Sequence, residues 1–405
     1  MPSGARGAEP SDIERADPRE ALRRLPGPLQ LPLTYLTGKA YRGQRGPRAT
    51  ATFHLLAATV SLLAGVALSA VAYTAPAWWS VPVLLAGWAV TLHGMRNLRM
   101  MVFHQCAHRN MWRRRRLDRT LGRALAGLLL VQGFEQYSRE HVTDHHAVHH
   151  MTLRDPTVQA FLLTLEIRPG MTRRQMWRAV LRKLLSPAYH ARFLAARVRG
   201  YWSTSDRWDR AVSGLCYAAL AAALTWWGGW LGFLVCWALP LTVLFQISNT
   251  LRLCVKHTFP QPGAARTRGK EHFAGLTNAI FLCAAPPDRR LSGVRKWSAW
   301  LGWWASLLFV HFPSRYLVLT GDTVCHDYHH RHPMSREWAD YLFARQRDIE
   351  GGHPGWPPYE AAWGLVPAVN RVFDSLGTAD PDVYDATLIE QAHAGRRAAF
   401  LAFDD

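Results

Sequence analysis

Apolar residues along the chain gather in four long stretches that form two closely spaced pairs. Residues 51–73 contain only one ionisable side chain, His54, and are long enough to cross a bilayer core of about 30 Å. Three further stretches of this kind cover residues 77–95, 211–228 and 229–248. The turns at 74–76 and 228–229 are uncharged and flanked by tryptophans, as is typical of a membrane–water boundary. The pattern predicts four transmembrane helices in two hairpins.

Three other stretches are amphipathic or too short to span. Residues 120–134 and 297–312 are apolar but only 15 and 16 residues long, so we expect both to lie in the membrane interface. Residues 171–185 alternate apolar positions with arginines at helical spacing. This third stretch predicts a basic amphipathic helix on the membrane surface.

The segments between the predicted spans are strongly basic. Nine arginines lie between Arg96 and Arg123, and such segments stay in the cytoplasm. We therefore expect an all-α integral membrane protein whose two termini and helical cap are cytoplasmic. The formal charge of +19 agrees with this orientation and with attraction to anionic lipid, and no nucleic-acid partner is expected.

Composition divides the chain into three segments. Residues 1–50 are rich in Pro, Gly, Arg and Ala and lack the apolar core of a signal peptide, which predicts a flexible basic cytosolic segment. Residues 51–335 form the predicted membrane domain, and residues 336–405 a cytosolic C-terminal segment. The six cysteines show no CxxC spacing, as expected of reduced thiols.

Histidines cluster in the segments predicted to be cytoplasmic. The stretch "HVTDHHAVHH" at 141–150 holds five of them, and neutral imidazole is the commonest metal ligand in proteins. In "HQCAH", His104 and His108 share one helix face if the preceding span continues. A third group, "CHDYHHRHP" at 325–333, adds His326, His329 and His330.

The chemistry of these ligands limits the metal. Imidazole-only coordination disfavours Mg and Ca and suits Fe, Zn or Cu, and eight or more imidazoles exceed the needs of one four- to six-coordinate ion. Two metal ions are the natural count. The HExxH motif of zincins is absent from the sequence. A soluble di-iron bundle needs paired ExxH motifs, and the candidate "EQAH" at 390–393 lies far downstream of the histidine groups.

Three motifs in this order resemble the histidine boxes of the membrane fatty acid desaturase and hydroxylase superfamily. They are HxxxH at 104–108, HxxxHH at 141–146 followed by "RDP" at 154–156, and HxxHHxxP at 326–333. The resemblance runs from about residue 50 to 335. It implies a non-haem di-iron centre that uses O2 as co-substrate to attack an unactivated C–H bond, with two iron ions as cofactors. The ligands it implies are His104, His108, His141, His145, His146, His326, His329 and His330.

His257 is a ninth predicted ligand, although it lies in none of the three motifs. The second predicted span ends near Met95 and the fourth near Ser248, and His104 and His257 each follow nine residues later. The two imidazoles would therefore stand at one depth if the helices continue. Related desaturases resemble this chain in having an extra ligand histidine after the last membrane helix. The alternative is a basic helix end without metal chemistry.

Several residues beside the motifs are expected to play lesser parts. Asp144, Asp327 and Glu140 are candidates to accept the second N–H of a ligand histidine, or are solvated charges. His149 and His150 depart from the family pattern, and we expect second-layer or surface positions for both rather than metal ligation. No metal role is expected for His54, His93, His190, His272, His311, His332, His353 or His393.

The most favoured function is that of an acyl desaturase, with an acyl or alkyl hydroxylase of the same superfamily as the alternative. A membrane zinc hydrolase is a less favoured alternative enzyme. A metal-binding or transport protein is also less favoured, because a transporter should have ionisable residues inside its helices and only His54 and His93 lie inside the predicted spans. The substrate is expected to be an acyl chain on a lipid, on coenzyme A or on acyl carrier protein. No flavin or ferredoxin motif is present, so we expect a separate electron donor such as a ferredoxin or reductase, attracted by the basic face.

Overall fold

Helices dominate the structure, a computed structural model that describes residues 17–389 except for 76, 147–148, 264–268 and 354. Two short strands, β1 (Ala279–Phe281) and β2 (Ala361–Trp363), pair in parallel with Ala279 opposite Ala361. The helices used below are α2 (Pro18–Ala21), α3 (Gly27–Thr37), α4 (Ala51–Thr74), α5 (Ser80–Asn97), α6 (His104–Ala107), α7 (Arg115–Leu129), α8 (Phe134–Arg139), α9 (Pro156–Gln159), α10 (Arg173–Leu184), α11 (Pro187–Thr204), α12 (Arg207–Trp226), α13 (Trp230–Phe233), α14 (Phe245–Lys256), α15 (Lys270–Gly275), α16 (Gly293–Ser306), α17 (His326–Arg331), α18 (Tyr341–Glu350) and α19 (Leu365–Gly377).

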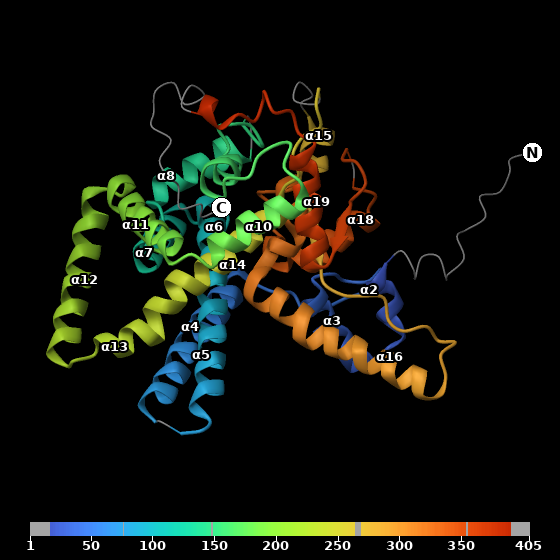
Figure 1. Ribbon diagram of the computed structural model, residues 1–405, viewed down its shortest axis with the longest axis horizontal. Helices are drawn as coiled ribbons and strands as arrows, with labels where there is room; N and C mark the ends of the chain where they lie inside the picture. The colour runs from blue at the N-terminus through green and yellow to red at the C-terminus, as the bar shows by residue number, and fades with distance from the viewer. Residues whose placement is uncertain (1–16, 76, 147–148, 264–268, 354, 390–405) are drawn as a thin grey trace, which may run out of the picture.

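Helices α4 and α5 form a long hairpin that projects from the rest of the molecule (Figure 1). Small residues line their contact, as is common where helices pack in a bilayer. A Cβ atom at Gly65 would collide with the backbone of Thr91, and one at Gly94 with the backbone of Leu62. These glycines therefore set the close approach of the two helices.

Within the part of the chain that the structure describes, two helices are long and apolar enough to cross a membrane: α4, with 24 residues, and the continuous helix Trp230–Lys256, with 27 residues. They occupy the first and fourth predicted spans. Helices α5 and α12 form where the second and third spans are predicted, so all four stretches are helical. The four-span topology itself remains a prediction.

The last of these helices extends further than the apolar pattern indicates. The fourth span is predicted to end at residue 248, whereas the helix continues unbroken to Lys256. It contains widened π-helical turns on both sides of Leu239, where Pro240 lacks an N–H group and crowds the preceding turn. The extension carries His257 into the layer of helices that surrounds the histidines.

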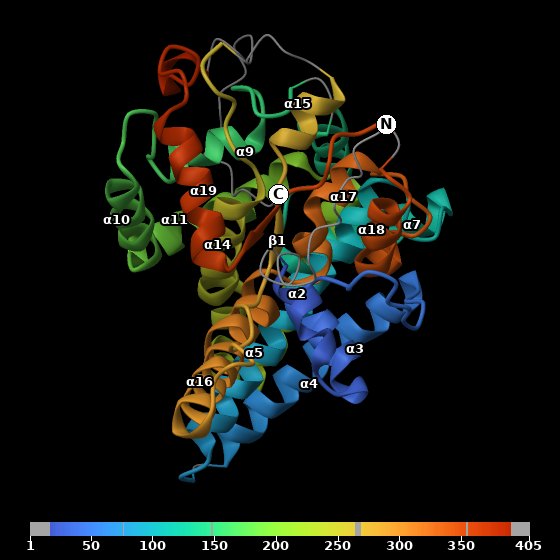
Figure 2. The ribbon, with the colours of Figure 1, turned by 90° about the vertical axis from the view of Figure 1, so that its right-hand side faces the viewer.

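That layer stands at one end of the α4–α5 hairpin and contains α6 to α9, α14, α17, α18 and α19 (Figures 1 and 2). One large apolar cluster runs through it and includes Phe103, Phe161, Val255 and Phe373. The β1–β2 pair lies inside this cluster and is buried along β1. Segments far apart in sequence are thereby held around a single core.

The N-terminal region differs from the predicted flexible segment over residues 17–50. Asp17 caps α2, and α3 packs through Leu33 against Trp303 of α16. Arg19 is fully buried and donates hydrogen bonds to Gln30, Thr34, Gln44 and the Lys39 carbonyl. Because a buried guanidinium needs all of these acceptors, the segment folds around it. The composition of the segment gives no sign of this arrangement.

The two helices predicted at the membrane surface and interface differ in how far their apolar residues are exposed. Helix α10 forms within 171–185, but its apolar residues Met176 and Val180 are fully buried, and Trp177 packs on Phe373 of α19. Part of its apolar face therefore packs against protein, whereas Leu181 and Leu185 are 49% and 81% exposed. The placement of this helix on a membrane surface stays a prediction. Helix α16, in contrast, leaves Trp297 and Leu301 exposed, as expected of an interfacial helix.

Candidate metal centre

Four helical elements bring the predicted histidines together. His104 and His108 lie one turn apart at α6, directly after a π-helical turn that continues from α5. His141 and His145 lie on a second π-helical turn, Glu140–His145, which continues α8. His326, His329 and His330 lie on α17, and His257 follows α14. Widened turns of this kind recur at functional sites, and here they adjoin the first two histidine motifs.

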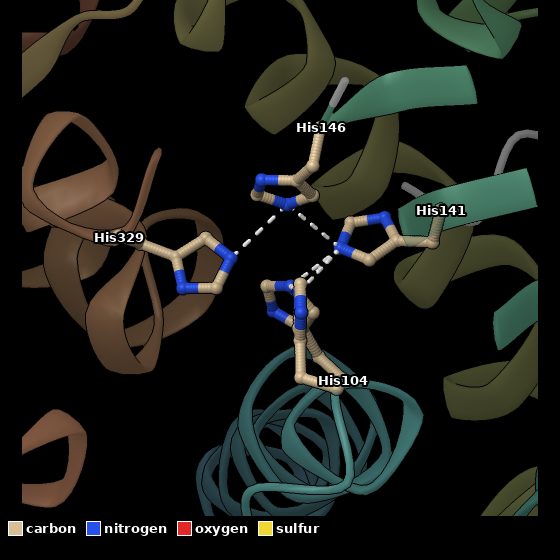
Figure 3. Close-up of side chains that lie close together, drawn as sticks. His104, His141, His146 and His329 are labelled. Carbon is tan, nitrogen blue, oxygen red and sulfur yellow. Dashed lines mark hydrogen bonds between the residues drawn. The ribbon is translucent and has the colours of Figure 1, made fainter. Parts of the chain in front are cut away.

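The first histidine group contains five residues. His104, His108, His141, His146 and His329 each direct one ring nitrogen to a common region, and these atoms all lie within 4.8 Å of one another. The Nε2 atoms of His146 and His141 are 3.0 Å apart, and those of His329 and His146 are 3.1 Å apart. Figure 3 shows four of these rings converging from three different segments.

The second group contains four residues. His145, His257, His326 and His330 also place one ring nitrogen each within 4.8 Å of the others. The Nε2 atoms of His326 and His257 are 3.1 Å apart. The two groups adjoin, since the rings of His146 and His330 stack with centroids 4.1 Å apart.

All nine predicted site residues therefore lie in the two groups, divided five and four. His257 belongs to the second group although no motif contains it. The structure shows this convergence, and the role of each residue as a metal ligand remains a prediction.

Hydrogen bonding alone cannot account for the first group. The Nε2 atoms of His104, His108 and His141 form a triangle with sides of 2.7, 3.1 and 3.2 Å. In a neutral imidazole each ring nitrogen is either a donor or an acceptor, so at least one side of any such triangle joins two donors or two acceptors. A central cation removes this conflict, because every nitrogen can then offer its lone pair.

The distances between the ring nitrogens also fit a bound metal ion. Nitrogen ligands at about 2.1 Å from an ion and at right angles to one another are about 3.0 Å apart, close to the observed separations. In the second group, the Nε2 atoms of His145 and His330 are buried and accept no hydrogen bond from the described residues. Both nitrogens are therefore available to a metal ion.

Burial keeps the imidazoles neutral. It lowers the pKa well below the ordinary value of 6.5, and neighbouring rings and cations lower it further, for His104, His141, His146, His257, His326, His329 and His330. Neutral imidazole is the form that binds metal. The site is thus prepared for a cation and strongly disfavours protonation.

Asp155 fixes the orientation of one ring. Its carboxylate accepts a hydrogen bond from His145 Nδ1 at 3.1 Å and from the backbone N–H groups of Met151 and Thr157 at 2.7 and 2.8 Å. Burial alone would raise the pKa of Asp155, but His145 and these N–H groups outweigh it and hold the pKa below its ordinary value. Since His145 donates from Nδ1, its Nε2 carries the lone pair.

Sequence reasoning missed this role of Asp155. The available signal was "RDP" at 154–156, in which Asp155 caps α9 and Pro156 begins it. Met151 adopts a left-handed conformation with φ of 54°, and Tyr384 donates a hydrogen bond to its carbonyl at 2.8 Å. This turn folds Asp155 back toward His145.

The acids predicted to support the ligands have other partners. Asp327 forms a buried ion pair with Arg345 at 2.6 Å, and Glu140 accepts a hydrogen bond from Gln132 at 2.7 Å. Each carboxylate is thus engaged by a donor other than a ligand histidine, and a supporting role for either acid stays a prediction. The side chain of Asp144 lies outside the described residues.

The two additional histidines of the second motif differ from each other. His149 contacts Arg154 at the surface, with 3.2 Å between Nε2 and Nη1. His150 is buried, donates from Nδ1 to the His145 carbonyl at 2.9 Å, and lies 4.7 Å from the His257 ring between centroids. Burial, followed by the proximity of His145, lowers the pKa of His150 to about 3. His150 thus lies beside the second group, and His149 does not.

The histidines without a predicted metal role lie outside both groups. His54, His93, His190 and His353 each bond to a backbone carbonyl, and His332 lies near Asp348. His393 is outside the described residues.

A cavity of about 470 Å³ reaches the first group from the surface. It is lined by His108, Ser138 and Val142, with Arg109, Glu135 and Arg139 at its rim. The cavity brings solvent and the charged surface of the protein close to one predicted ligand.

The family model for fatty acid desaturase matches residues 85–360. The chain belongs to the fatty acid desaturase family. The match covers more than half of the sequence and includes all three histidine motifs and His257. No curated protein matches the chain in a sequence comparison.

Membership of the fatty acid desaturase family defines the class of chemistry of this protein. The protein is an oxidoreductase of the desaturase and hydroxylase type with a histidine-rich metal site, and the family acts on lipid in a membrane setting. The two adjoining histidine groups are the part of the structure in which this chemistry would take place.

Proposed function

We propose that this protein is an iron- and O2-dependent desaturase of an acyl chain, with one iron bound by each histidine group. The observation that carries the proposal is the pair of adjoining groups with five and four imidazoles. An all-imidazole set suits iron and disfavours Mg and Ca. When bound, the two irons would supply the activation of O2 for attack on a C–H bond.

The residues of the chain would hold and orient this centre. His104, His108, His141, His146 and His329 would bind one iron, and His145, His257, His326 and His330 the other. Asp155 would keep His145 in the tautomer that offers Nε2. Outer partners of this kind typically change metal affinity by about 10- to 100-fold.

Apart from the cavity at His108, burial would separate the ligands from bulk water. His145 and His257 are fully buried, and Tyr137 stacks on His141 with ring centroids 5.1 Å apart. A dry site strengthens the electrostatic interactions that hold the ions.

The proposal includes a topology. Helices α4, α5, α12 and Trp230–Lys256 would cross the membrane, with both termini and the histidine groups in the cytoplasm. The membrane domain would cover residues 51–335. The basic loops between the helices support this orientation.

The proposal also includes partners. The substrate would be an acyl chain carried by a lipid, coenzyme A or acyl carrier protein, and electrons would come from a separate ferredoxin or reductase. Positive charge around the cavity at His108 supports docking of an acidic carrier.

Mass spectrometry of lipids and acyl carriers from cells with and without the protein tests the reaction. A product two hydrogens lighter identifies a desaturase, and a product one oxygen heavier identifies the hydroxylase. His329→Ala should abolish either product, whereas His353→Ala should not. The absence of any new product with wild-type protein that holds about two irons would overturn both assignments.

A further inference from the structure

Helix α12 stands away from the rest of the protein along most of its length (Figure 1). None of its twenty residues, all of which the structure describes, is buried. Val212 and Leu215 are 61% and 74% exposed. An apolar helix in this position needs apolar groups to pack against the face that points toward the rest of the protein, as well as against its outer face.

The two ends of α12 are nevertheless fixed. At the start of α12 Arg123 of α7 bonds to Asp209 at 2.8 Å, and midway along α12 Tyr217 donates to the Gly127 carbonyl at 2.6 Å. At the other end α12 turns directly into the helix Trp230–Lys256, whose Gly232 approaches Tyr73 of α4. The space between these ends is therefore a defined slot rather than a gap that can close.

This slot is a cavity of about 1070 Å³. Its walls come from α4, α7, α12 and the start of the helix Trp230–Lys256, and include Val66, Ala70, Val212, Leu220, Phe233 and Trp237. Arg123 and Asp209 line one end, and Thr74 and Gly229 line the other. Charged groups are thus confined to the end that meets α7.

The position of the cavity is separate from the metal centre. None of the nine histidines lines it. It extends along α4, a helix long enough to cross a membrane, and α12 rises about 1.5 Å per residue over twenty residues, which gives about 30 Å, the thickness of a hydrocarbon core. In the topology proposed above, on which this inference rests, the slot lies along the depth of the bilayer.

We propose that this cavity binds an acyl chain of a zwitterionic membrane phospholipid, with the headgroup at Arg123 and Asp209. The apolar walls match the chain. Both signs of charge are present at the polar end, where Arg123 lies between Asp209 at 2.8 Å and Asp206 at 2.6 Å. A headgroup that carries both phosphate and ammonium complements this arrangement, whereas a purely anionic headgroup would face two carboxylates.

The polar end also explains how one lipid would be retained. Lipid tails are as apolar as leucine side chains, so the transfer of a chain from bilayer to cavity has little hydrophobic driving force. Shape and headgroup contacts must then distinguish the bound lipid from its neighbours. The bound chain would brace α12 against α4 without taking part in the oxidation.

Photocrosslinking in nanodiscs tests the site. The probe is phosphatidylethanolamine with a diazirine in its acyl chain, added at a small fraction to phosphatidylglycerol discs that contain the full-length protein. We expect crosslinks to Ala70, Val212 or Cys216, lost when unlabelled phosphatidylethanolamine is added. Cys216→Trp fills the cavity and should reduce these crosslinks about tenfold, equivalent to about 1.4 kcal/mol.

Leu215→Trp is the matched control, because Leu215 is adjacent at the same depth but does not line the cavity. It should leave the crosslinks unchanged. Ala70→Phe fills the slot from the opposite wall and should act as Cys216→Trp does. Bound metal and melting temperature report folding of each variant independently of lipid.

Three results would overturn the proposal. The first is equal crosslinking in Cys216→Trp and Leu215→Trp, or crosslinks that unlabelled phosphatidylethanolamine does not displace, which indicate ordinary surrounding lipid. The second is equal labelling by a diazirine-bearing phosphatidylglycerol, which removes the headgroup preference. The third is chemical crosslinking of two copies through Cys216, which assigns the cavity to a second chain. If neither filling variant folds, displacement of the probe from wild-type protein decides.

Discussion

His145 donates a hydrogen bond from Nδ1 to Asp155 across 3.1 Å, and both side chains are completely buried. The contact joins a ring of the second histidine group to a carboxylate that also caps α9. It shows how the turn after the second motif controls a predicted metal ligand. The orientation of His145 therefore depends on residues ten positions further along the chain.

Replacement of Asp155 tests this coupling. Asp155→Asn should lower the affinity of the second group for metal about 10- to 100-fold, because the amide no longer stabilises the tautomer that offers Nε2. Titration with a competing chelator measures the change. Asp374→Asn removes an exposed carboxylate paired with Arg173 and should have no effect. An unchanged affinity in Asp155→Asn would show that the ring is oriented by packing alone.

Single histidine replacements should empty the groups separately. His257→Ala should reduce bound iron from about two ions to about one, since His257 lies in the second group only. His108→Ala should also leave about one ion, in the other group. Elemental analysis of purified protein gives the ratio, with His353→Ala as the control that keeps both. One zinc and no iron in wild-type protein would contradict the di-iron proposal.

Acid should destabilise the metal-free protein. Burial holds the pKa of seven histidines well below 6.5 in the folded state, while the unfolded chain protonates near that value. The unfolded state therefore binds more protons below pH 6.5, and stability falls as pH decreases. Each such histidine contributes at most about 1.4 kcal/mol per pH unit, a slope that is approached only well below pH 6.5 and is about half as large at pH 6.5. Melting curves between pH 7.5 and 5.5 measure the loss, and a melting temperature independent of pH would refute it.

Cysteine labelling in intact cells tests the proposed topology. With the exposed Cys216 replaced by Ala, an impermeant thiol reagent should modify Thr74→Cys, at the end of α4, but not Arg139→Cys, beside the histidines. Both positions are exposed on the protein, so the membrane alone would distinguish them. The reverse pattern would place the metal site outside the cytoplasm.

The arginines near His108 should govern electron transfer from an acidic carrier. Reversal of charge at Arg109 and Arg139 should slow reduction of the metal centre by a small acidic ferredoxin about tenfold or more at low salt, and should weaken the dependence on ionic strength. Stopped-flow measurements give the rate. The rate of reduction by dithionite should stay unchanged in these variants. The control, Arg289→Glu with Arg290→Glu, should be reduced by the ferredoxin as fast as the wild-type protein. Equal rates of reduction by the ferredoxin in all variants would show that the electron donor docks at another surface.

The sequence by itself predicted the helical class, the positions of the long apolar helices and the nine converging histidines. Periodicity is local, so the spacing of His104 and His108 places both on one helix face before any packing is known. The equal distance of His104 and His257 from the ends of their helices similarly predicted a common depth. The fatty acid desaturase family followed from the order of the three motifs.

Only the tertiary structure decided how these residues are grouped. His145 and His146 are neighbours in sequence, yet they belong to different groups, because successive side chains at the end of a helical turn point in different directions. Which acid supports which ring was likewise decided by packing: Arg345 engages Asp327, and the turn at Met151 brings Asp155 to His145. Contacts between distant segments depend on how helices fill a shared core, and local patterns of apolar and polar residues contain little information about such contacts.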